Sequence, residues 1–332
     1  MLRCFAIIVT YNSGASIGPC LEALAREDCE VVLVDNASHD ETVARVEEFV
    51  AWHPVHLVAN SENLGFAAAV NQGARESSGD VLLVLNSDAI AEPGAVKALL
   101  QCLETSGAVA AGGALLDDDG QPARGFAFRR LPTLASLLCE VMLVNQLWPH
   151  NPVNRSYRCL DADYSQQQEV EQPAGACLAI TRAAWESVGG FDEQFFPVWF
   201  EDVDLCKRLL ERSGKIVYCP TARFRHSGGH SVGQLPFRDK QMFWYGNMLR
   251  YARKHFSSGQ VATLRAGIVA GMLLRSLAAL FGARQAPLGE TLSTYWAVAR
   301  SIIFFWDRGP CPHDAAGVTR QSKPPRQQSR PK

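Results

Sequence analysis

The ten cysteines of this sequence form no Cys-x-x-Cys pair and no regular framework. Several of them stand inside apolar runs (Cys4, Cys102, Cys177 and Cys206), where a reduced thiol behaves as a small hydrophobic group. Secreted proteins that depend on disulfides space their cysteines in recognisable pairs instead. The cysteine pattern therefore favours a cytoplasmic protein whose thiols stay reduced.

The sequence also lacks the glycine-rich loops of common nucleotide sites. Its first apolar run, Cys4–Val9, is too short for the core of a signal peptide and leads directly into Thr10-Tyr11-Asn12, so we expect a first β-strand there. No Gly-x-Gly-x-x-Gly motif follows that strand, which argues against a dinucleotide site. No basic glycine-rich loop follows it either, which argues against a nucleotidyltransferase that holds a triphosphate there.

An uncharged apolar segment long enough to span a membrane is missing as well. Ala266–Ala283 is mostly apolar but holds Arg275 near its middle, and such an arginine costs roughly 2.5–3.5 kcal/mol in a spanning helix. Trp296–Trp306 contains Arg300 and is too short to span. We expect both segments to lie on a membrane surface, with Arg275 reaching toward water. A helical subdomain packed on the core is the alternative.

Charge is distributed unevenly along the chain. Residues 1–237 have a formal net charge of −13, and residues 238–332 have one of +11. This asymmetry suggests a catalytic module tethered to something anionic, and a domain with a solubilising tail is the alternative. We expect a catalytic domain over residues 1–237, a helical, membrane-associating extension over 238–306 and a disordered basic tail over 307–332.

Strand-like and helix-like segments alternate through the first hundred residues. The hydrophobic content of 47% indicates a globular chain. Expected strands are Cys4–Thr10, Val31–Asp35, Val55–Val58 and Val81–Leu85, and expected helices are Ile17–Arg26, Glu41–Val50, Phe66–Arg75 and Gly94–Leu103. Such alternation predicts an α/β fold with a parallel sheet buried on both faces.

The remainder of the chain is less regular. Residues 117–171 contain a helix-like patch at Leu134–Leu147, and we expect them to form an excursion around an acceptor site. Order resumes with an expected strand at Pro173–Thr181, a helix from Glu201 to Arg212 and a strand at Ile216–Cys219 that leads to His226.

Polar residues gather where three of the expected strands end. These clusters are Thr10-Tyr11-Asn12, Asp35-Asn36-Ala37-Ser38 and Asn86-Ser87-Asp88. Open α/β sheets bind their ligands beyond the carboxyl ends of the strands, so the three clusters predict one binding site.

Further motifs follow in a fixed order along the chain. They are Asn63-Leu64-Gly65-Phe66, Pro173-Ala174-Gly175-Ala176, Gly189-Gly190-Phe191-Asp192-Glu193, Trp199-Phe200-Glu201-Asp202-Val203-Asp204 and His226 to Ser231. Together with the strand-end clusters, this order resembles the inverting family 2 glycosyltransferases of the GT-A fold, and within them the bacterial rhamnosyltransferase-like branch. The resemblance covers about residues 1–255.

The resemblance implies both a fold and a reaction. It implies a mostly parallel central sheet with helices on both faces, followed by a helical C-terminal extension. The implied reaction moves rhamnose or a similar hexose from a dTDP- or UDP-sugar to a hydroxyl of a lipid-linked or polysaccharide acceptor in cell-surface glycan synthesis. It implies no nucleic-acid partner, and the basic C-terminal region places the enzyme on the inner face of the cytoplasmic membrane.

The resemblance also assigns the donor nucleotide to residues of the strand ends. Thr10 and Asn12 hold the nucleoside, and Asp35 accepts a hydrogen bond from the ring N–H that uracil and thymine each present. The same site includes Tyr11, Asn36, Asn63, Gly65, Asn86 and Ser87. The alternative is that Asp35 and Ser38 only cap the following turn and helix. The amides of Asn63-Leu64-Gly65-Phe66, which opens the next helix, can face an anion, and helix capping by Asn63 is an alternative that can hold at the same time.

A divalent metal site is implied at Asn86-Ser87-Asp88, where related enzymes often carry Asp-x-Asp. Asp88 remains a hard oxygen ligand for Mg²⁺ or Mn²⁺, and His226 would complete the site and favour Mn²⁺. The glycines that follow His226 permit close approach of a phosphate. A histidine that is simply hydrogen-bonded at a strand end is the alternative.

The resemblance places the general base at Asp202, with Glu201 as its supporting neighbour. Both follow an aromatic run, which lowers local polarity and offers a sugar-stacking face. The acceptor side also includes Gly175, Ala176, Trp199 and Phe200. Acidic residues that merely complement a helix dipole are the alternative. We expect Asp204 and Arg208 to form an ordinary surface pair.

A different class of function also fits parts of the sequence. A non-catalytic protein that binds nucleotide sugars would need the same strand-end clusters. Asn86, which replaces a carboxylate, is the one feature in its favour.

Overall fold

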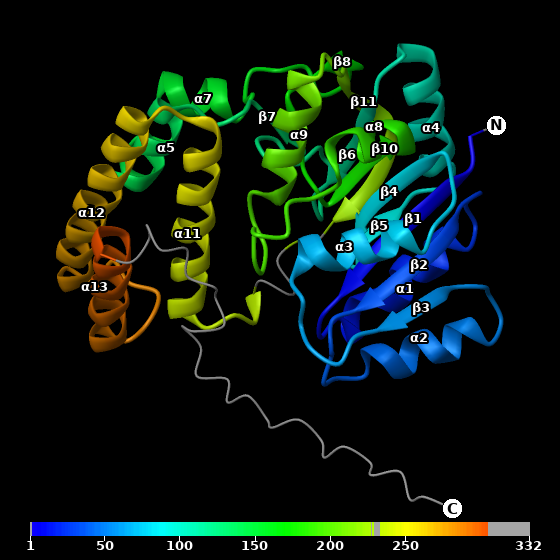
Figure 1. Ribbon diagram of the computed structural model, residues 1–332, viewed down its shortest axis with the longest axis horizontal. Helices are drawn as coiled ribbons and strands as arrows, with labels where there is room; N and C mark the ends of the chain where they lie inside the picture. The colour runs from blue at the N-terminus through cyan, green and yellow to red at the C-terminus, as the bar shows by residue number, and fades with distance from the viewer. Residues whose placement is uncertain (1, 227, 229–232, 305–332) are drawn as a thin grey trace, which may run out of the picture.

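The computed structural model describes residues 2–226, 228 and 233–304 (Figure 1). The expected basic tail, most of the segment after His226 and the last two residues of Trp296–Trp306 lie outside the described residues. Among the described residues, nine strands form one sheet in the order β3-β2-β1-β4-β10-β6-β11-β5, with β8 also paired to β11.

The first part of the sheet follows the expected alternation of strands and helices. Its elements are β1 (Cys4–Thr10), α1 (Gly14–Leu24), β2 (Glu30–Asp35), α2 (Thr42–Val50), β3 (His56–Ala59), α3 (Phe66–Arg75) and β4 (Val81–Asn86). The strands β3, β2, β1 and β4 are all parallel. Since β1, β2 and β4 are buried on both faces, each reads as a nearly continuous apolar run, and their prediction is confirmed.

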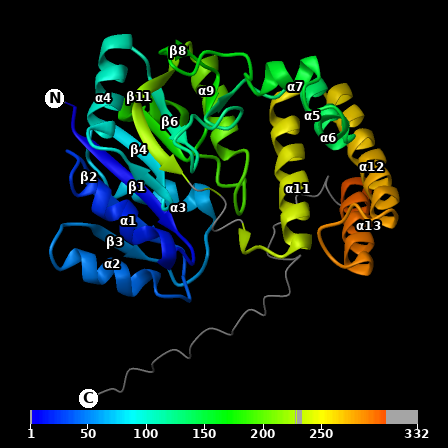
Figure 2. The same cartoon turned by 180° about the vertical axis from the view of Figure 1, so that it is seen from behind.

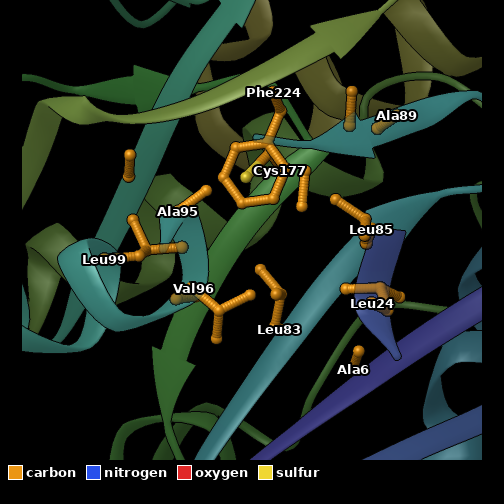
Figure 3. Close-up of a cluster of buried hydrophobic side chains, with 14 of the residues drawn as sticks. Ala6, Leu24, Leu83, Leu85, Ala89, Ala95, Val96, Leu99, Cys177 and Phe224 are labelled. Atoms are coloured by element: carbon orange, nitrogen blue, oxygen red, sulfur yellow. The ribbon is translucent and has the colours of Figure 1, made fainter. Parts of the chain in front are cut away.

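Short strands and a helix follow β4 and complete this half of the core. They are β5 (Ala89–Ala91), α4 (Ala95–Ser106) and β6 (Ala110–Leu116). Figure 3 shows Leu83 and Leu85 of β4 packed with Val96 and Leu99 of α4 and with Phe224 from a later strand.

The sequence analysis missed β6, which lies between β10 and β11. Its sequence, Ala-Ala-Gly-Gly-Ala-Leu-Leu, is poor in β-branched and aromatic residues, which are the usual signal of a strand. A Cβ on Gly112 would lie 2.4 Å from the Cβ of Pro173. The small residues thus allow another segment to cross β6 closely.

The expected strand Pro173–Thr181 is two strands in the structure. β9 (Gln172–Pro173) pairs with β7 (Phe128–Arg129) outside the main sheet, and β10 (Cys177–Thr181) runs antiparallel between β4 and β6. β11 (Ile216–His226) is longer than expected, because its register shifts between Cys219 and Arg223 and it then continues to His226. β8 (Gln168–Glu169), α8 (Arg182–Val188) and α9 (Glu201–Glu211) complete this part.

The C-terminal helices form a second hydrophobic cluster beside the sheet. They are α11 (Phe237–His255), α12 (Ser258–Leu280) and α13 (Leu288–Phe304), joined by α5 (Leu134–Val141), α6 (Val144–Leu147) and α7 (Pro152–Tyr157). Figures 1 and 2 show α11 between the sheet and the pair α12–α13. Phe195, Phe200 and Val203, which flank the start of α9, pack into the same cluster. The extension is therefore joined to the sheet domain through that segment.

Packing alters the expectation for the membrane segments. α11 buries one face in the protein, with Tyr245, Met248 and Tyr251 in the core, as the packed-subdomain alternative expects for this helix. Arg275 does not reach toward water, since its guanidinium donates hydrogen bonds to the carbonyl oxygens of Glu140 and Val141 at the end of α5. Among the described helices, α12 is long and apolar enough to cross a membrane, although 28% of its most apolar window is buried in the protein.

Candidate active site

A cavity of about 430 Å³ opens where the carboxyl ends of β1 and β4 meet the aromatic loop before α9. Most of the predicted site residues line it, although they come from distant parts of the sequence. These residues are Tyr11, Asn36, Asn63, Asn86, Ser87, Asp88, Gly175, Ala176, Trp199, Phe200, Glu201, Asp202 and His226. The folding of the chain thus brings the expected donor, metal, base and acceptor residues to one place.

Thr10 and Asp35 lie behind the cavity wall and bind each other. The Thr10 hydroxyl donates to Asp35 Oδ1 at 2.7 Å, and the Ser38 hydroxyl donates to the same oxygen at 2.6 Å. The Ser38 amide donates to Asp35 Oδ2 at 2.9 Å. The capping alternative is therefore present at Asp35 and Ser38, while Oδ2, with one such bond, retains room for a further donor.

The loops after β1, β2 and β3 are tied together by side chains. The backbone N–H of Asn12 donates to Ser38 Oγ, and the side-chain Oδ1 of Asn12 accepts from the backbone N–H of His39. Asn63 Oδ1 accepts from the backbone amide of Gly65 at 2.9 Å, which closes a turn before α3. Helix capping by Asn63 is wrong, because Gly65 is the N-cap residue of α3 and no side chain caps this helix.

An anion at the start of α3 would find few free donors. The Gly65 amide is bound to Asn63, and the Phe66 amide donates to the carbonyl of Pro197 at 2.7 Å. Both amides that we expected to face an anion therefore have protein partners. Gly65 itself is required for close packing, because its φ is 84° and a Cβ there would lie 2.8 Å from the ring of Phe196.

Asp88 and His226 form a buried pair at the end of β4 and β11. Asp88 Oδ1 lies 3.3 Å from His226 Nε2, and the side chains are 8% and 5% exposed. The Asn86 amide nitrogen lies 3.4 Å from the same ring nitrogen, and the ring of Phe126 stacks on His226 at 5.3 Å. β11 pairs with β5 through His226 and Ala89, which fixes the imidazole beside the Asn86-Ser87-Asp88 turn.

This pair fits a divalent metal ion. Two adjacent ligands of one octahedral Mg²⁺ ion lie roughly 3 Å apart, close to the separation of Asp88 and His226. A carboxylate oxygen and an imidazole nitrogen together suit Mn²⁺. Within the described residues no group of three or more His, Cys, Asp and Glu side chains gathers that could hold a metal ion.

Asp202 faces the cavity from the first turn of α9. Its Oδ2 accepts hydrogen bonds from the amide of Gly175 at 3.0 Å and from Nε2 of Gln172 at 3.1 Å. Its Oδ1 accepts from the amide of Val203 at 2.8 Å. The protein atoms packed around Asp202 raise its pKa above the ordinary value, and the Gly175 and Val203 amides and the charge of Arg129 oppose that rise.

Glu201, its neighbour, is in a different environment. It is 4% exposed, and no described residue forms a hydrogen bond with its Oε2. Burial, followed by the charge of Asp202, raises the pKa of Glu201 well above the ordinary value. Both of these neighbouring carboxyl groups therefore have a pKa above the ordinary value.

The loop before α9 is held in an unusual conformation by α11. Trp199 and Phe200 have φ values of 83° and 72°, a region that bulky residues rarely adopt. Nδ2 of the buried Asn247 donates to the carbonyls of Phe196 at 3.1 Å and Val198 at 2.8 Å. Trp199 then packs edge-to-face on Trp244 of α11, with ring centroids 5.6 Å apart.

The expectation of a surface pair at Asp204 and Arg208 is wrong. Asp204 has no exposed surface and contacts Arg208 Nε at 2.7 Å, Lys254 Nζ at 2.9 Å and His255 Nε2 at 2.7 Å. Burial alone would raise the pKa of Asp204, but the hydrogen bond from His255 and the charges of Arg208 and Lys254 hold it below the ordinary value. The residues that would have indicated a buried Asp204 are Lys254 and His255, which α11 places next to α9.

Several cavity residues were not predicted. They are chiefly Phe126, Arg129, Tyr157, Gln172 and Trp244. The first three come from residues 117–171, so that excursion does reach the cavity. Arg129 and Gln172 are paired across β7 and β9, strands of two residues each that leave no pattern in the sequence.

Comparison with known proteins identifies the family. Residues 5–148 match the model of the glycosyl transferase family 2, and residues 155–230 match that described as the N-terminal domain of galactosyltransferase. An N-acetylglucosaminyl-diphospho-decaprenol L-rhamnosyltransferase of Mycobacterium tuberculosis is 32% identical over 245 residues, covering 69% of this chain and 78% of the relative. The chain belongs to glycosyltransferase family 2. The expected rhamnosyltransferase-like branch is confirmed.

A more distant relative and solved structures agree with this assignment. A glucosyl-dolichyl phosphate glucuronosyltransferase of Haloferax volcanii is 24% identical, covering 71% of each chain. A mannosyltransferase of Pyrobaculum calidifontis, solved with GDP-Man and Mn²⁺, matches 92% of this chain and 82% of its own at 17% identity and a TM-score of 0.52. GalNAc-T7, solved with UDP, GalNAc and Mn²⁺, matches 91% of this chain and 56% of its own at 15% identity and a TM-score of 0.57. The expected GT-A fold is confirmed, and so is the prediction that the chain is a glycosyltransferase of family 2.

The buried cluster around Asp204 makes a testable prediction about stability. Asp204→Ala leaves Arg208, Lys254 and His255 without the buried carboxylate that all three contact, so we expect the free energy of unfolding to fall by about 3–5 kcal/mol. Urea denaturation followed by circular dichroism measures it. Glu211→Ala on the same helix removes the partner of Lys207 in an exposed pair and should cost at most about 1 kcal/mol. Equal losses in the two variants would contradict the buried cluster.

Proposed function

We propose that this family 2 glycosyltransferase is an inverting enzyme that transfers rhamnose or a similar hexose from a dTDP- or UDP-sugar to a hydroxyl of a lipid-linked acceptor in cell-surface glycan synthesis. One observation carries the proposal: the Asp88–His226 pair and the Asp202 carboxylate line the same cavity. The pair suits the donor diphosphate, and the carboxylate suits the acceptor hydroxyl.

A lipid-linked acceptor is favoured over a free polysaccharide. The relatives from Mycobacterium tuberculosis and Haloferax volcanii are named for sugars carried on decaprenol and on dolichyl phosphate, and both match about seven-tenths of this chain. The rhamnosyltransferase name of the first relative is the support for rhamnose. The structural neighbours solved with GDP-Man and with UDP carry different nucleotides and do not favour one.

The reaction follows from the states of the two adjacent carboxyl groups. Asp202 takes the proton of the acceptor hydroxyl while that oxygen bonds to the anomeric carbon of the donor sugar, and the bond from this carbon to the diphosphate breaks. The electron pair of that bond leaves with the nucleoside diphosphate. Because its pKa is raised, Asp202 is a stronger base than an ordinary aspartate. The raised pKa of Glu201 favours its neutral form, which adds no second negative charge beside the base.

The donor is assigned to the opposite side of the cavity. Thr10, Asn12 and Asp35 would hold the nucleoside together with Tyr11 and Asn36, and the unfilled Oδ2 of Asp35 suits the imide N–H of uracil or thymine. Asp88 and His226 would hold Mn²⁺ or Mg²⁺. When bound, that ion would neutralise the charge on the departing diphosphate.

A membrane-bound position is supported by exposed apolar side chains on α12 and α13. Leu273, Leu277 and Phe281 follow one another on one face at 64%, 54% and 85% exposure. Trp296 and Ile303 continue the exposed apolar surface on α13, at 67% and 47%. Arg300, also exposed, lies between them and suits an anionic headgroup. We therefore place this surface on the cytoplasmic face of the cell membrane, where a lipid-linked acceptor would be reached.

The assignment of the base predicts opposite results for two neighbouring variants. Asp202→Asn keeps the shape of the side chain but cannot take the proton, so acceptor-dependent release of nucleoside diphosphate should fall about 10²–10⁴-fold. Glu201→Gln resembles the protonated glutamic acid that is already present and should keep activity within about tenfold. The reverse ranking would assign the base to Glu201.

The assignment of the metal predicts its dependence on two residues. EDTA should abolish transfer, and added Mn²⁺ should restore it. In Asp88→Ala the binding of nucleoside diphosphate, measured by calorimetry, should no longer depend on Mn²⁺, and His226→Ala should weaken that dependence. Full activity in EDTA would show that neither residue serves a metal ion.

The membrane surface predicts selective loss of lipid binding. Wild-type protein should float with vesicles that contain anionic lipid and be partly released by high salt. In Leu277→Glu with Phe281→Glu, the loss of two apolar side chains, each contributing about 1.5–3 kcal/mol when buried, should reduce binding more than about tenfold. Trp52→Glu, a change at an exposed tryptophan beyond α2, is the matched control and should float normally. Full-length protein that does not float would overturn the membrane surface.

A further inference from the structure

Gln172 contacts the proposed base and had no place in the sequence analysis. It lies on β9, is 5% exposed and lines the cavity. Its Nε2 donates to the carbonyl of Pro173 and to Asp202 Oδ2, both at 3.1 Å. Both partners are acceptors, so the amide nitrogen, not the amide oxygen, must face them.

The contacts of Asp202 distinguish its two oxygens. Oδ2 accepts from the Gly175 amide and from Gln172, which occupies both of its lone pairs. Within the part of the chain that the structure describes, Oδ1 accepts one hydrogen bond from another residue, from the backbone amide of Val203. A proton arriving from an acceptor hydroxyl therefore has a free lone pair at Oδ1 and none at Oδ2.

From this geometry we infer that Gln172 is a positioning residue, which holds Oδ2 of Asp202 so that Oδ1 receives the proton of the acceptor. The inference rests on the proposed function and deepens it by naming the atom that acts. Gln172 touches the base rather than the reacting atoms, so its effect passes through Asp202.

The other side of the Gln172 amide supports a functional role. Its Oε1 is buried and has no hydrogen-bond partner among the described residues. An unpaired buried carbonyl reduces stability, and an apolar side chain of similar length would avoid that cost. The chain nevertheless has an amide here, and the bond to Asp202 is the contact that an apolar side chain could not supply.

The groups around Asp202 determine in which direction its pKa shifts when the Gln172 hydrogen bond is lost. Glu201 and Cys206 on α9 both have a pKa well above the ordinary value and are neutral, and Arg129 on β7 carries a positive charge. The Gln172 hydrogen bond favours the ionised form of Asp202. Its loss raises the pKa of Asp202, so activity, which needs the ionised base, should appear at higher pH.

The test is the pH profile of kcat/KM for the acceptor in wild type, Gln172→Met and Gln101→Met. In Gln172→Met the acid limb should move upward by about one pH unit, since a hydrogen bond to a charged group is worth about that much. The dissociation constant for the nucleoside diphosphate should stay unchanged, and the unfolding midpoint should not fall. Gln101 is an exposed glutamine on α4, and its replacement should move nothing.

A second measurement keeps the inference testable without activity. A carbon-13 NMR titration of the Asp202 carboxyl should show the same upward shift in Gln172→Met. An unmoved acid limb and titration would overturn the inference, and so would a loss of activity that is matched by a lower unfolding midpoint. Failure of the proposed function is seen separately, as a wild-type enzyme that releases no nucleoside diphosphate with any acceptor while the titration shift persists.

Discussion

A carboxylate without any exposed surface, Asp204, stands two residues after the proposed base on α9. Removing such a group from water costs several kcal/mol unless cations and hydrogen-bond donors surround it. Arg208 comes from the same helix, but Lys254 and His255 come from the last turn of α11. The start of α9 can therefore be stable in this position only when α11 lies against it.

The same helix compensates for backbone strain. Trp199 and Phe200 both adopt positive φ, and each such residue costs roughly 1–2 kcal/mol. The amide of Asn247 binds two carbonyls of this loop, and Trp244 and Tyr251 pack against its rings. The strained turn directs the aromatic rings and the following carboxyl groups into the cavity. In this way α11 acts as part of the active-site wall as well as of the C-terminal extension.

The sequence predicted the parts of the molecule whose signal is local. The buried strands β1, β2 and β4 are continuous apolar runs, and the polar residues after them can be read directly as a strand-end site. The strand β6 could not be found in this way, because alanine and glycine suit the close crossing of Pro173 but carry no strand signal. The surroundings of Asp202 were also hidden, since Gln172 and Arg129 reach it through two-residue strands whose pairing depends on the tertiary fold.

Charge and aromatic patterns misled for a related reason. Asp204 and Arg208 have the spacing of a surface pair, and only the arrival of α11 makes them buried. α11 lies in the extension that we expected to associate with the membrane, but its Trp244 lines the cavity and its Tyr245 and Tyr251 are core residues. A pattern within one helix cannot reveal which of its faces another helix will cover.

The position of α11 links the proposed active site to the proposed membrane surface. One side of this helix holds the loop and the charge cluster that set the base, and the other packs on α12 and α13, whose outer surface is apolar and exposed (Figures 1 and 2). If that outer surface rests on lipid, the distance from the bilayer to the cavity is fixed by the thickness of this helical layer rather than by a flexible linker. The acidic body, repelled by an anionic surface, would then be held away from the lipid by the same layer. A lipid-linked sugar would thus meet Asp202 at a defined height, because anchoring and catalysis share one rigid element.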